Sequence, residues 1–165
     1  MNPMDPIVEE YKHETSVTRK ALERVPETKM SWKPHERSMT LGQLASHLAD
    51  TQGWTRSILE QSEFNVGADF KPFKSTSTAD ILAEFDKNVA SSLATMKKGY
   101  TMEKLMQPWS LKQNGQVVFS MPRIAVIRVF VLSHQIHHRG QLTVYLRMND
   151  LPVPSIYGPS ADEQS

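Results

Sequence analysis

The sequence predicts an all-α fold: a four-helix bundle with long crossover connections and a small β-hairpin before the last helix, in one domain over residues 1–165. Three observations lead to this prediction. Four segments repeat apolar residues at helical spacing, long polar stretches separate some of them, and an Asn-Gly pair lies between two short apolar runs.

The first predicted helix covers residues 5–25. Asp5 is an N-cap acceptor, and Pro6 takes the first helical position, where its missing N–H costs nothing. Pro26 ends the helix, because proline disfavours a helical conformation in the residue before it. The predicted start and end therefore both come from proline chemistry.

The second predicted helix runs from Thr40 to about Gln61. Its first residues, Thr40-Leu-Gly-Gln43, form a capping box, in which the glutamine side chain reaches back to the backbone of the cap residue. Apolar residues then recur every three or four positions. The polar segment over residues 62–76 is predicted to be a long connection.

A third helix is predicted to begin at Ser77, which again starts a box-like capping sequence, and to end before Gly99, a residue suited to the left-handed position after a helix. Residues 111–119 change to a strand pattern. Asn114-Gly115 in their middle is the strongest short-range signal of a two-residue hairpin turn.

The fourth predicted helix runs from Pro122 to about Met148, with Asn149 as a left-handed cap. It carries two apolar stripes, so it is buried on two sides, either within the bundle or at a subunit interface. The second stripe consists of Val129, Leu132, Ile136 and Thr143. We therefore expect a homodimer, with burial of this stripe against the hairpin as the alternative.

The composition excludes several classes of function. With 39% hydrophobic and 22% charged residues, the chain has the balance of a folded globular protein. Its 19 basic and 18 acidic residues leave a net charge of +1, which offers no electrostatic footprint for nucleic acid. The absence of cysteine excludes disulfides, thiolate metal ligands and a cysteine nucleophile.

The apolar segments also argue against a membrane protein. The first residues show no signal-peptide pattern, and the most apolar run, residues 124–132, contains an arginine and falls short of the roughly 20 residues that span a bilayer. We therefore expect a soluble, cytoplasmic protein with neither a membrane nor a nucleic-acid partner.

The histidines carry the chemical signal. Six are present: His13, His35, His47, His134, His137 and His138. His134 and His138 lie four residues apart in the fourth helix, so both project from one face with Cβ atoms about 5–6 Å apart and can bind one metal ion. A histidine pair alone is a weak signal. Its position within an apolar stripe strengthens it, because two adjacent buried imidazoles need a shared partner.

A third ligand is needed, and His47 on the second helix is the natural candidate. A lone helical histidine is more often a hydrogen-bonded core residue, and His13 and His137 are rivals by composition. His137 points about 100° away from His138, so it is expected at the rim of the site or at the surface. Gln135 stands within the histidine pair and no glutamate does, so the zinc-protease signature with its general base is absent.

Two motifs resemble those of a known family. Thr40-Leu-Gly-Gln-Leu-Ala-Ser-His47-Leu-Ala-Asp50 resembles the second-helix motif of the DinB/YfiT-like family, and Ser133-His-Gln-Ile-His-His-Arg-Gly-Gln-Leu142 is similar to its fourth-helix motif. The tail over residues 154–163 is also similar. The resemblance implies a four-helix bundle, often dimeric, that binds a divalent metal ion through three histidines, which map to His47, His134 and His138.

The same resemblance bears on activity. Relatives include thiol-dependent transferases and isomerases that use mycothiol or bacillithiol. Some relatives place a glutamate where this chain has Gln135, so a general base at that position is not expected here.

Three neutral imidazoles leave a tetrahedral metal ion with one open position, as in catalytic zinc sites. A water or thiol that binds at the open position has its pKa lowered by the metal ion. Because the chain has no cysteine, any thiolate must come from a low-molecular-weight cosubstrate. We expect a metal-dependent enzyme acting on a small molecule, of the thiol-dependent S-transferase or hydrolase type. The alternative is a non-catalytic metal-binding stress-response dimer. Zinc or nickel is the expected ion, with iron, manganese and cobalt as alternatives.

Four further residues are candidates for the surroundings of the metal. Asp50 is placed either to orient a ligand imidazole or at the surface, and Trp54 is expected mainly in core packing. Gln141 and Tyr145 are placed equally well to line a pocket or to pack in the core. A thiol-dependent transferase would have a roomy pocket with anion-binding groups at the open metal position, whereas a non-catalytic protein would have that position closed.

Overall fold

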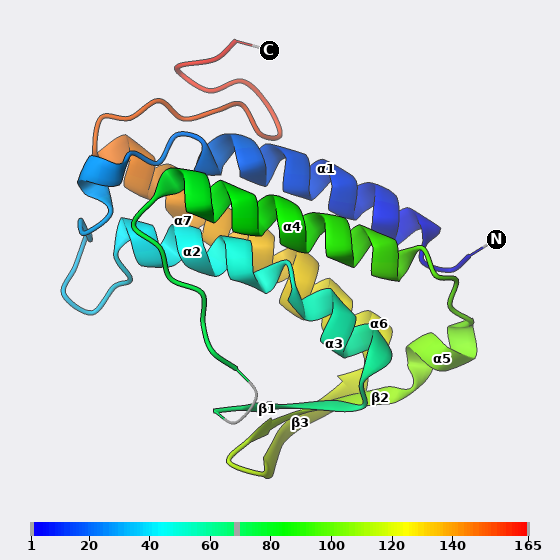
Figure 1. Cartoon of the computed structure of the whole chain (residues 1–165). Helices are drawn as coiled ribbons and strands as arrows, with labels where there is room; N and C mark the ends of the chain where they lie inside the picture. The colour runs from blue at the N-terminus through cyan, green and yellow to red at the C-terminus, as the bar shows by residue number, and fades with distance from the viewer. Residues whose placement is uncertain (1, 68–69, 165) are drawn as a thin grey trace.

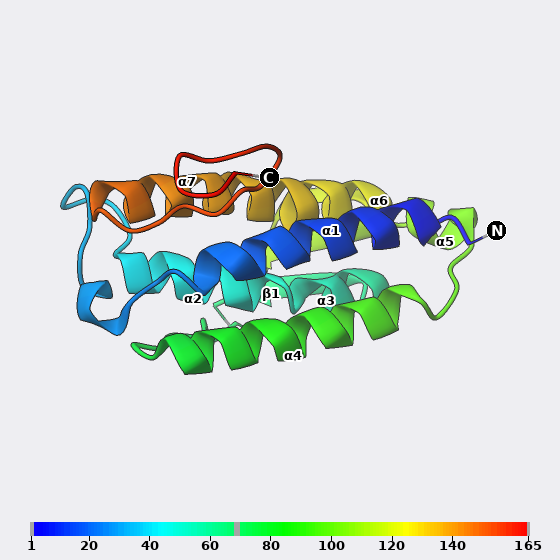
Figure 2. The same cartoon turned by 90° about the horizontal axis from the view of Figure 1, so that it is seen from above.

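The computed structural model describes residues 2–67 and 70–164. Long helical segments lie side by side with nearly aligned axes, and a small sheet lies beneath their middle in the view of Figure 1 (Figures 1 and 2). The long segments are α1 (Asp5–Leu22), α2 (Leu41–Thr51) followed by α3 (Trp54–Glu60), α4 (Thr78–Met96) and α7 (His134–Met148). The shorter elements are η1 (Glu27–Lys29), β1 (Glu63–Val66), α5 (Met102–Met106), β2 (Pro108–Gln113), β3 (Gln116–Pro122), α6 (Arg123–Val126) and the π-helix η2 (Ile127–Ser133).

Two of the predicted helix starts are confirmed in atomic detail. The Thr40 side chain accepts a hydrogen bond from the Gln43 backbone, and the Gln43 side chain accepts one from the Thr40 backbone at 2.8 Å. Ser77 caps α4 by accepting from the Asp80 backbone at 3.3 Å. The cap predicted for α1 is wrong by one position, because Asp5 already lies within the first turn. Its negative charge there still interacts favourably with the positive N-terminal end of the helix dipole.

The predicted second helix is divided into α2 and α3. Side-chain amides donate hydrogen bonds to backbone carbonyls that would otherwise accept from the next turn of the helix. The Gln52 side chain donates to the Leu48 carbonyl at 3.0 Å, and the Asn88 side chain of α4 donates to the Ala49 carbonyl at 3.1 Å. Gly53 follows, close to Asn88. The helix therefore ends here because α4 supplies partners from outside the segment.

The sheet is larger than the predicted hairpin. Asn114 and Gly115 form the expected two-residue turn, with φ of 50° and 79°, between antiparallel β2 and β3. Strand β1 then adds to β2 in parallel, with Phe64 opposite Leu111. It lies within the stretch predicted to be a connection, whose residues 68 and 69 fall outside the described part of the chain. The chain is thus mostly helical with a three-stranded sheet, and the prediction of an all-α fold is corrected to that extent.

The predicted fourth helix is continuous but not uniform. It begins as α6, widens into the seven-residue π-helix η2, and returns to α-helix at His134. The left-handed residue after it is Asp150, with φ of 56°, whereas Asn149 has φ of −107°, so the cap prediction is wrong by one position. The predicted dimer stripe is not one free surface, because Leu132 is fully buried in the core.

Two apolar clusters form the core. The first joins α1, α2, α4 and α7 and includes Leu22, Leu44, Phe85 and Leu142. The second joins the start of α1 with α3, α6, η2 and the sheet. Figure 2 also shows the C-terminal segment folded back along α7. No helix within the described residues has the length and apolar character needed to cross a membrane.

Candidate metal centre

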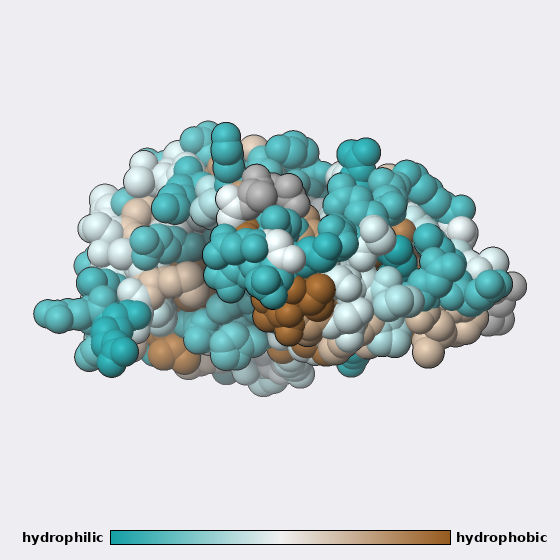
Figure 3. All heavy atoms as spheres, turned by 90° about the horizontal axis from the view of Figure 1, so that it is seen from below, coloured by the Kyte–Doolittle hydropathy of each residue, from teal (hydrophilic) through white to brown (hydrophobic). Residues whose placement is uncertain are grey.

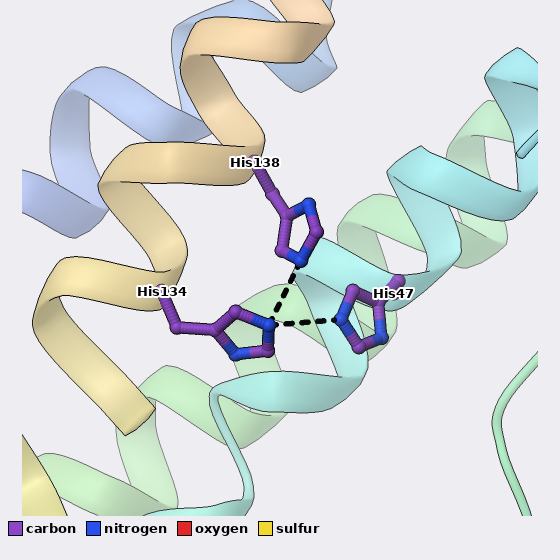
Figure 4. Close-up of side chains that lie close together, drawn as sticks. All are labelled: His47, His134 and His138. Atoms are coloured by element: carbon purple, nitrogen blue, oxygen red, sulfur yellow. Dashed lines mark hydrogen bonds between the residues drawn. The ribbon is translucent and has the colours of Figure 1, made fainter. Parts of the chain in front are cut away.

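The structure brings His47, His134 and His138 together. His47 lies in the middle of α2, and the other two lie on successive turns of α7, which packs against α2. Figure 4 shows their rings turned toward a common point. The Nε2 atoms of His47 and His134 are 3.4 Å apart, and those of His134 and His138 are 2.8 Å apart. All three histidines offer a ring nitrogen within 4.8 Å of the others.

These distances fit one shared cation. Zinc–imidazole bonds of about 2.0–2.1 Å in tetrahedral geometry place ligand nitrogens about 3.3 Å apart. The two Nε2–Nε2 distances, 3.4 Å and 2.8 Å, lie within about half an ångström of that value. Small side-chain rotations would therefore be enough to bring the nitrogens into coordinating positions.

The protonation states also fit a cation. The pKa values of His47 and His134 are both lowered to about 4, chiefly by burial and in smaller part by the neighbouring triad imidazoles. The pKa of His138 is lowered mainly by burial as well. Its Nδ1–H donates to Gln141 Oε1 at 2.7 Å. Nε2 is therefore unprotonated, and its lone pair faces the other rings. Neutral imidazoles with convergent lone pairs are what a divalent ion needs.

Trp54 and Gln141 contact the triad directly. The Trp54 ring meets His47 edge-on at 6.0 Å between centroids and lies tilted against His134 at 5.4 Å. Gln141 holds His138 through the hydrogen bond described above. The two side chains therefore restrict all three imidazoles, as neighbours of metal ligands do in known sites.

Asp50 and Tyr145 lie elsewhere. Burial raises the pKa of Asp50 to about 6, a backbone hydrogen bond from Phe73 opposes the shift, and Glu84 adds to it. Tyr145 packs edge-on against Trp32, with ring centroids 5.4 Å apart, beside the first apolar cluster. Within the described residues, neither side chain has a hydrogen bond or ring contact with the three histidines.

The other histidines are outside the triad. The His13 ring stacks on Tyr157 at 6.3 Å, and the His35 ring accepts a hydrogen bond from the Arg37 backbone. His137 contacts His138 ring to ring, but it is exposed and lines the adjacent cavity. In the part of the chain that the structure describes, no fourth histidine, cysteine or carboxylate joins the group.

A cavity of about 520 Å³ lies beside the triad, between α3, η2 and the sheet, and His47 and His134 form part of its wall. The remaining wall is mainly apolar, and six of its side chains are aromatic: Trp54, Phe64, Phe70, Trp109, Phe119 and Phe130. On the face that carries the sheet, apolar side chains gather near the middle and are surrounded by hydrophilic ones (Figure 3). Sequence reasoning missed this cavity because its residues come from separate segments, where each one resembles ordinary core.

Arg139 shows how α7 is oriented. Its guanidinium is buried and pairs with Glu14 of α1 at 2.7 Å, and the Tyr157 hydroxyl donates to the same carboxylate at 2.7 Å. A buried ion pair holds its geometry tightly, because either charge left alone would be costly. The pair fixes one face of α7 against α1, which leaves His138 on the face toward α2.

The comparisons with known proteins find relatives over nearly the whole chain. A model of the DinB family matches residues 1–165. The YrdA protein of Bacillus subtilis is 25% identical over 160 residues, which cover 97% of this chain and 91% of that protein.

Two solved structures share the fold. A DinB-like protein from Bacillus cereus has a TM-score of 0.70 at 24% identity, over 90% of this chain and 94% of that one. YfiT from Bacillus subtilis, described as a probable metal-dependent hydrolase with an unusual four-helix bundle topology, has a TM-score of 0.64 at 14% identity, over 88% and 87% of the two chains. With the family match over its whole length, the chain belongs to the DinB family.

Proposed function

We propose that this protein is a metal-dependent enzyme that acts on a small molecule, with a divalent metal ion held by His47, His134 and His138. The observation that carries the proposal is the convergence of three neutral imidazoles at the wall of a cavity large enough for a ligand. When bound, such an ion supplies a Lewis acid with a free coordination position, which lowers the pKa of a water or thiol. Zinc and nickel are the first candidates.

The protein's own residues would prepare this site. Gln141 holds the His138 ring so that Nε2 stays unprotonated, and Trp54 packs against the other two rings. Aromatic side chains line the cavity that borders the triad. Ser133 and His137 are the polar side chains that line the cavity next to the triad, so they are placed to contact a polar group of the substrate.

Hydrolysis is better supported than transfer from an anionic thiol. The lining residues that the structure describes include no lysine or arginine, so the anion-binding groups expected for such a thiol are lacking from the wall. Gln135 is fully buried and carries no titratable group, so it cannot act as a general base, and activation of a water would rest on the metal ion alone. The description of YfiT as a probable metal-dependent hydrolase points in the same direction.

The test uses protein loaded with zinc or nickel in two assays. One follows hydrolysis of nitrophenyl esters, and the other follows conjugation of low-molecular-weight thiols to an electrophile by mass spectrometry. We expect ester hydrolysis well above that of His138→Ala, with His35→Ala as the matched control that keeps wild-type activity. Rates no higher than those of His138→Ala in both assays, with either metal, would favour the non-catalytic metal-binding alternative.

A further inference from the structure

The cavity beside the triad indicates which part of a substrate it accepts. We propose that it binds the uncharged apolar part of a small molecule, an aromatic ring or aliphatic chain, whose polar reactive end lies at the three histidines. This inference rests on the proposed function and adds the substrate class to it. Its volume of about 520 Å³ falls in the range of small-molecule pockets.

The apolar walls hold one another in place. Phe119 and Phe130 are stacked at 4.8 Å with ring planes 14° apart, and Trp109 meets Phe119 at 6.2 Å. On the opposite wall Trp54 and Phe70 meet edge to face at 6.1 Å. Such ring contacts are favourable in themselves, so the cavity has a formed shape before any ligand enters.

The polar groups of the wall are gathered at one end. Ser133, His134 and His137 lie on one turn of the helix, and His47 faces His134 across 3.4 Å. The rest of the wall is aromatic or aliphatic. A ligand with one polar end and one apolar end therefore matches the distribution of groups, with the polar end at the triad.

Charge discriminates between ligand classes. The described residues of the wall include no Asp, Glu, Lys or Arg. A carboxylate or phosphate that entered the apolar end would lose its hydration without a cation to replace it. An added methylene group, in contrast, gains about fourfold in affinity when it leaves water for an apolar wall.

The experiment measures binding to metal-free protein by tryptophan fluorescence. Two of the three tryptophans, Trp54 and Trp109, line the cavity, so the Trp32→Phe variant leaves only cavity tryptophans as reporters. The probes are benzyl alcohol, phenylethanol, phenylpropanol and phenylbutanol. We expect affinity to rise about three- to fourfold per methylene, and the anion phenylbutanoate to bind about tenfold more weakly than phenylbutanol.

A matched pair of variants locates the binding. Val129 lines the cavity with 47% of its surface exposed, and Val144 lies on α7 away from it with 56% exposed. Both positions are open enough to accept aspartate without unfolding. In the same Trp32→Phe background, Val129→Asp should weaken phenylbutanol binding about tenfold, and Val144→Asp should leave it within about twofold. Equal effects of the two substitutions, an absent chain-length trend or equal affinity for the anion would each overturn the inference.

A second measurement tests whether one ligand occupies the cavity and binds the metal ion at the triad. In zinc-loaded protein, phenylpropanohydroxamate should bind at least about tenfold more tightly than acetohydroxamate, and Val129→Asp should reduce that ratio. Equal affinity of the two hydroxamates would show that the cavity and the ion do not share one ligand. Retention of zinc is measured separately by dialysis. Loss of zinc with a preserved alcohol series would reject only the proposed metal function, whereas retained zinc without the series would reject only the inference.

Discussion

Six histidines occur in this chain, and their surroundings separate three of them from the others. His47, His134 and His138 are withdrawn from water, depressed in pKa and turned toward each other. His13 and His35 instead contact residues of the surface. The helical spacing of the pair was visible in the sequence, but the proximity of His47 depends on how α2 packs against α7.

The first prediction concerns the ligands. Replacing any one of His47, His134 or His138 by alanine should remove most bound metal, because two imidazoles hold a divalent ion far less firmly than three. The measurement is metal content after dialysis against zinc or nickel. Full metal content in His47→Ala would contradict a site shared between α2 and α7.

The matched controls are the remaining histidines. His13→Ala, His35→Ala and His137→Ala should retain wild-type metal content, because none of them belongs to the convergent group. Loss of metal in His137→Ala would identify His137 as a ligand and place the site on the cavity side of α7.

The second prediction concerns pH in the metal-free protein. The pKa values of His47 and His134 are about 4 in the fold, against 6.5 for an unperturbed histidine, so the unfolded chain binds more protons between these values. The free energy of unfolding should therefore fall as the pH drops from about 6.5 to about 4. Denaturant melts across this window measure it.

Asp50 must be separated from this effect, because its pKa is raised to about 6 and works in the opposite direction. The histidine contribution is the difference between wild type and the His47→Gln/His134→Gln variant, which should lose less stability between neutral and acidic pH. An identical pH dependence of the two proteins would show that the imidazoles are not held neutral by the fold.

At the scale of elements, the site lies where helices are irregular. The break between α2 and α3 follows His47 by about one turn, and the π-helix η2 ends directly before His134. A π-helix takes more residues per turn, so it changes which residues face the sheet and which face α2. Both irregularities border the cavity, where Trp54 and Phe130 lie on its wall.

The third prediction uses two helical glycines. A Cβ at Gly42 would lie 3.1 Å from both the carbonyl oxygen and the sulfur of Met30, and that carbonyl already accepts a hydrogen bond from Gly42 at 2.9 Å. Gly42→Ala should therefore destabilise the protein by about 1–3 kcal/mol, since the backbone contact cannot yield easily.

Gly140→Ala is the matched comparison on α7. Nothing lies within 4 Å of a Cβ there, so alanine should stabilise the protein by about 1 kcal/mol through helix propensity alone. Thermal or denaturant unfolding of both variants measures the difference. A stabilising Gly42→Ala would mean that the η1–α2 contact moves freely.

At the scale of the whole molecule, the two apolar clusters contain none of the three triad histidines. They connect α1, α2, α4 and α7 on one side and α3, η2 and the sheet on the other. The buried pair of Arg139 and Glu14 adds a fixed contact between the first and last helices. The triad lies beside this framework and does not replace any part of it.

The fourth prediction follows from that framework. A chelator should leave the helical circular dichroism unchanged at room temperature, because burial of the apolar clusters is sufficient to fold the chain. Added metal should raise the stability only by linkage, about 2.7 kcal/mol at a hundredfold excess over Kd. Loss of helical signal on chelation would identify the triad as a structural site.

The fifth prediction concerns assembly. We still expect a homodimer, although Leu132 of the predicted stripe is buried within the chain and cannot take part in the contact. Val144 and Met148 remain exposed on α7, at 56% and 55%. Light scattering at micromolar concentration should give twice the mass of the chain, and Met148→Asp tests this face. A monomer mass in the wild type would reject the dimer.

The sequence alone was sufficient for everything that depends on local chemistry. The capping residues Thr40 and Ser77, the Asn114-Gly115 turn and the spacing of His134 and His138 act over a few residues, and the structure shows each of them as expected. The two motifs that resemble those of the DinB family are local as well, and the match over residues 1–165 confirms the family.

Tertiary structure decided what depends on contacts between distant segments. Strand β1 exists because β2 pairs with it across more than forty residues of sequence, and the break after α2 exists because α4 supplies hydrogen-bond donors. The burial of Arg139 required Glu14 of the first helix, more than a hundred residues earlier. The cavity is likewise assembled from separate segments, and periodicity within one helix or strand carries no information about which neighbours will meet there.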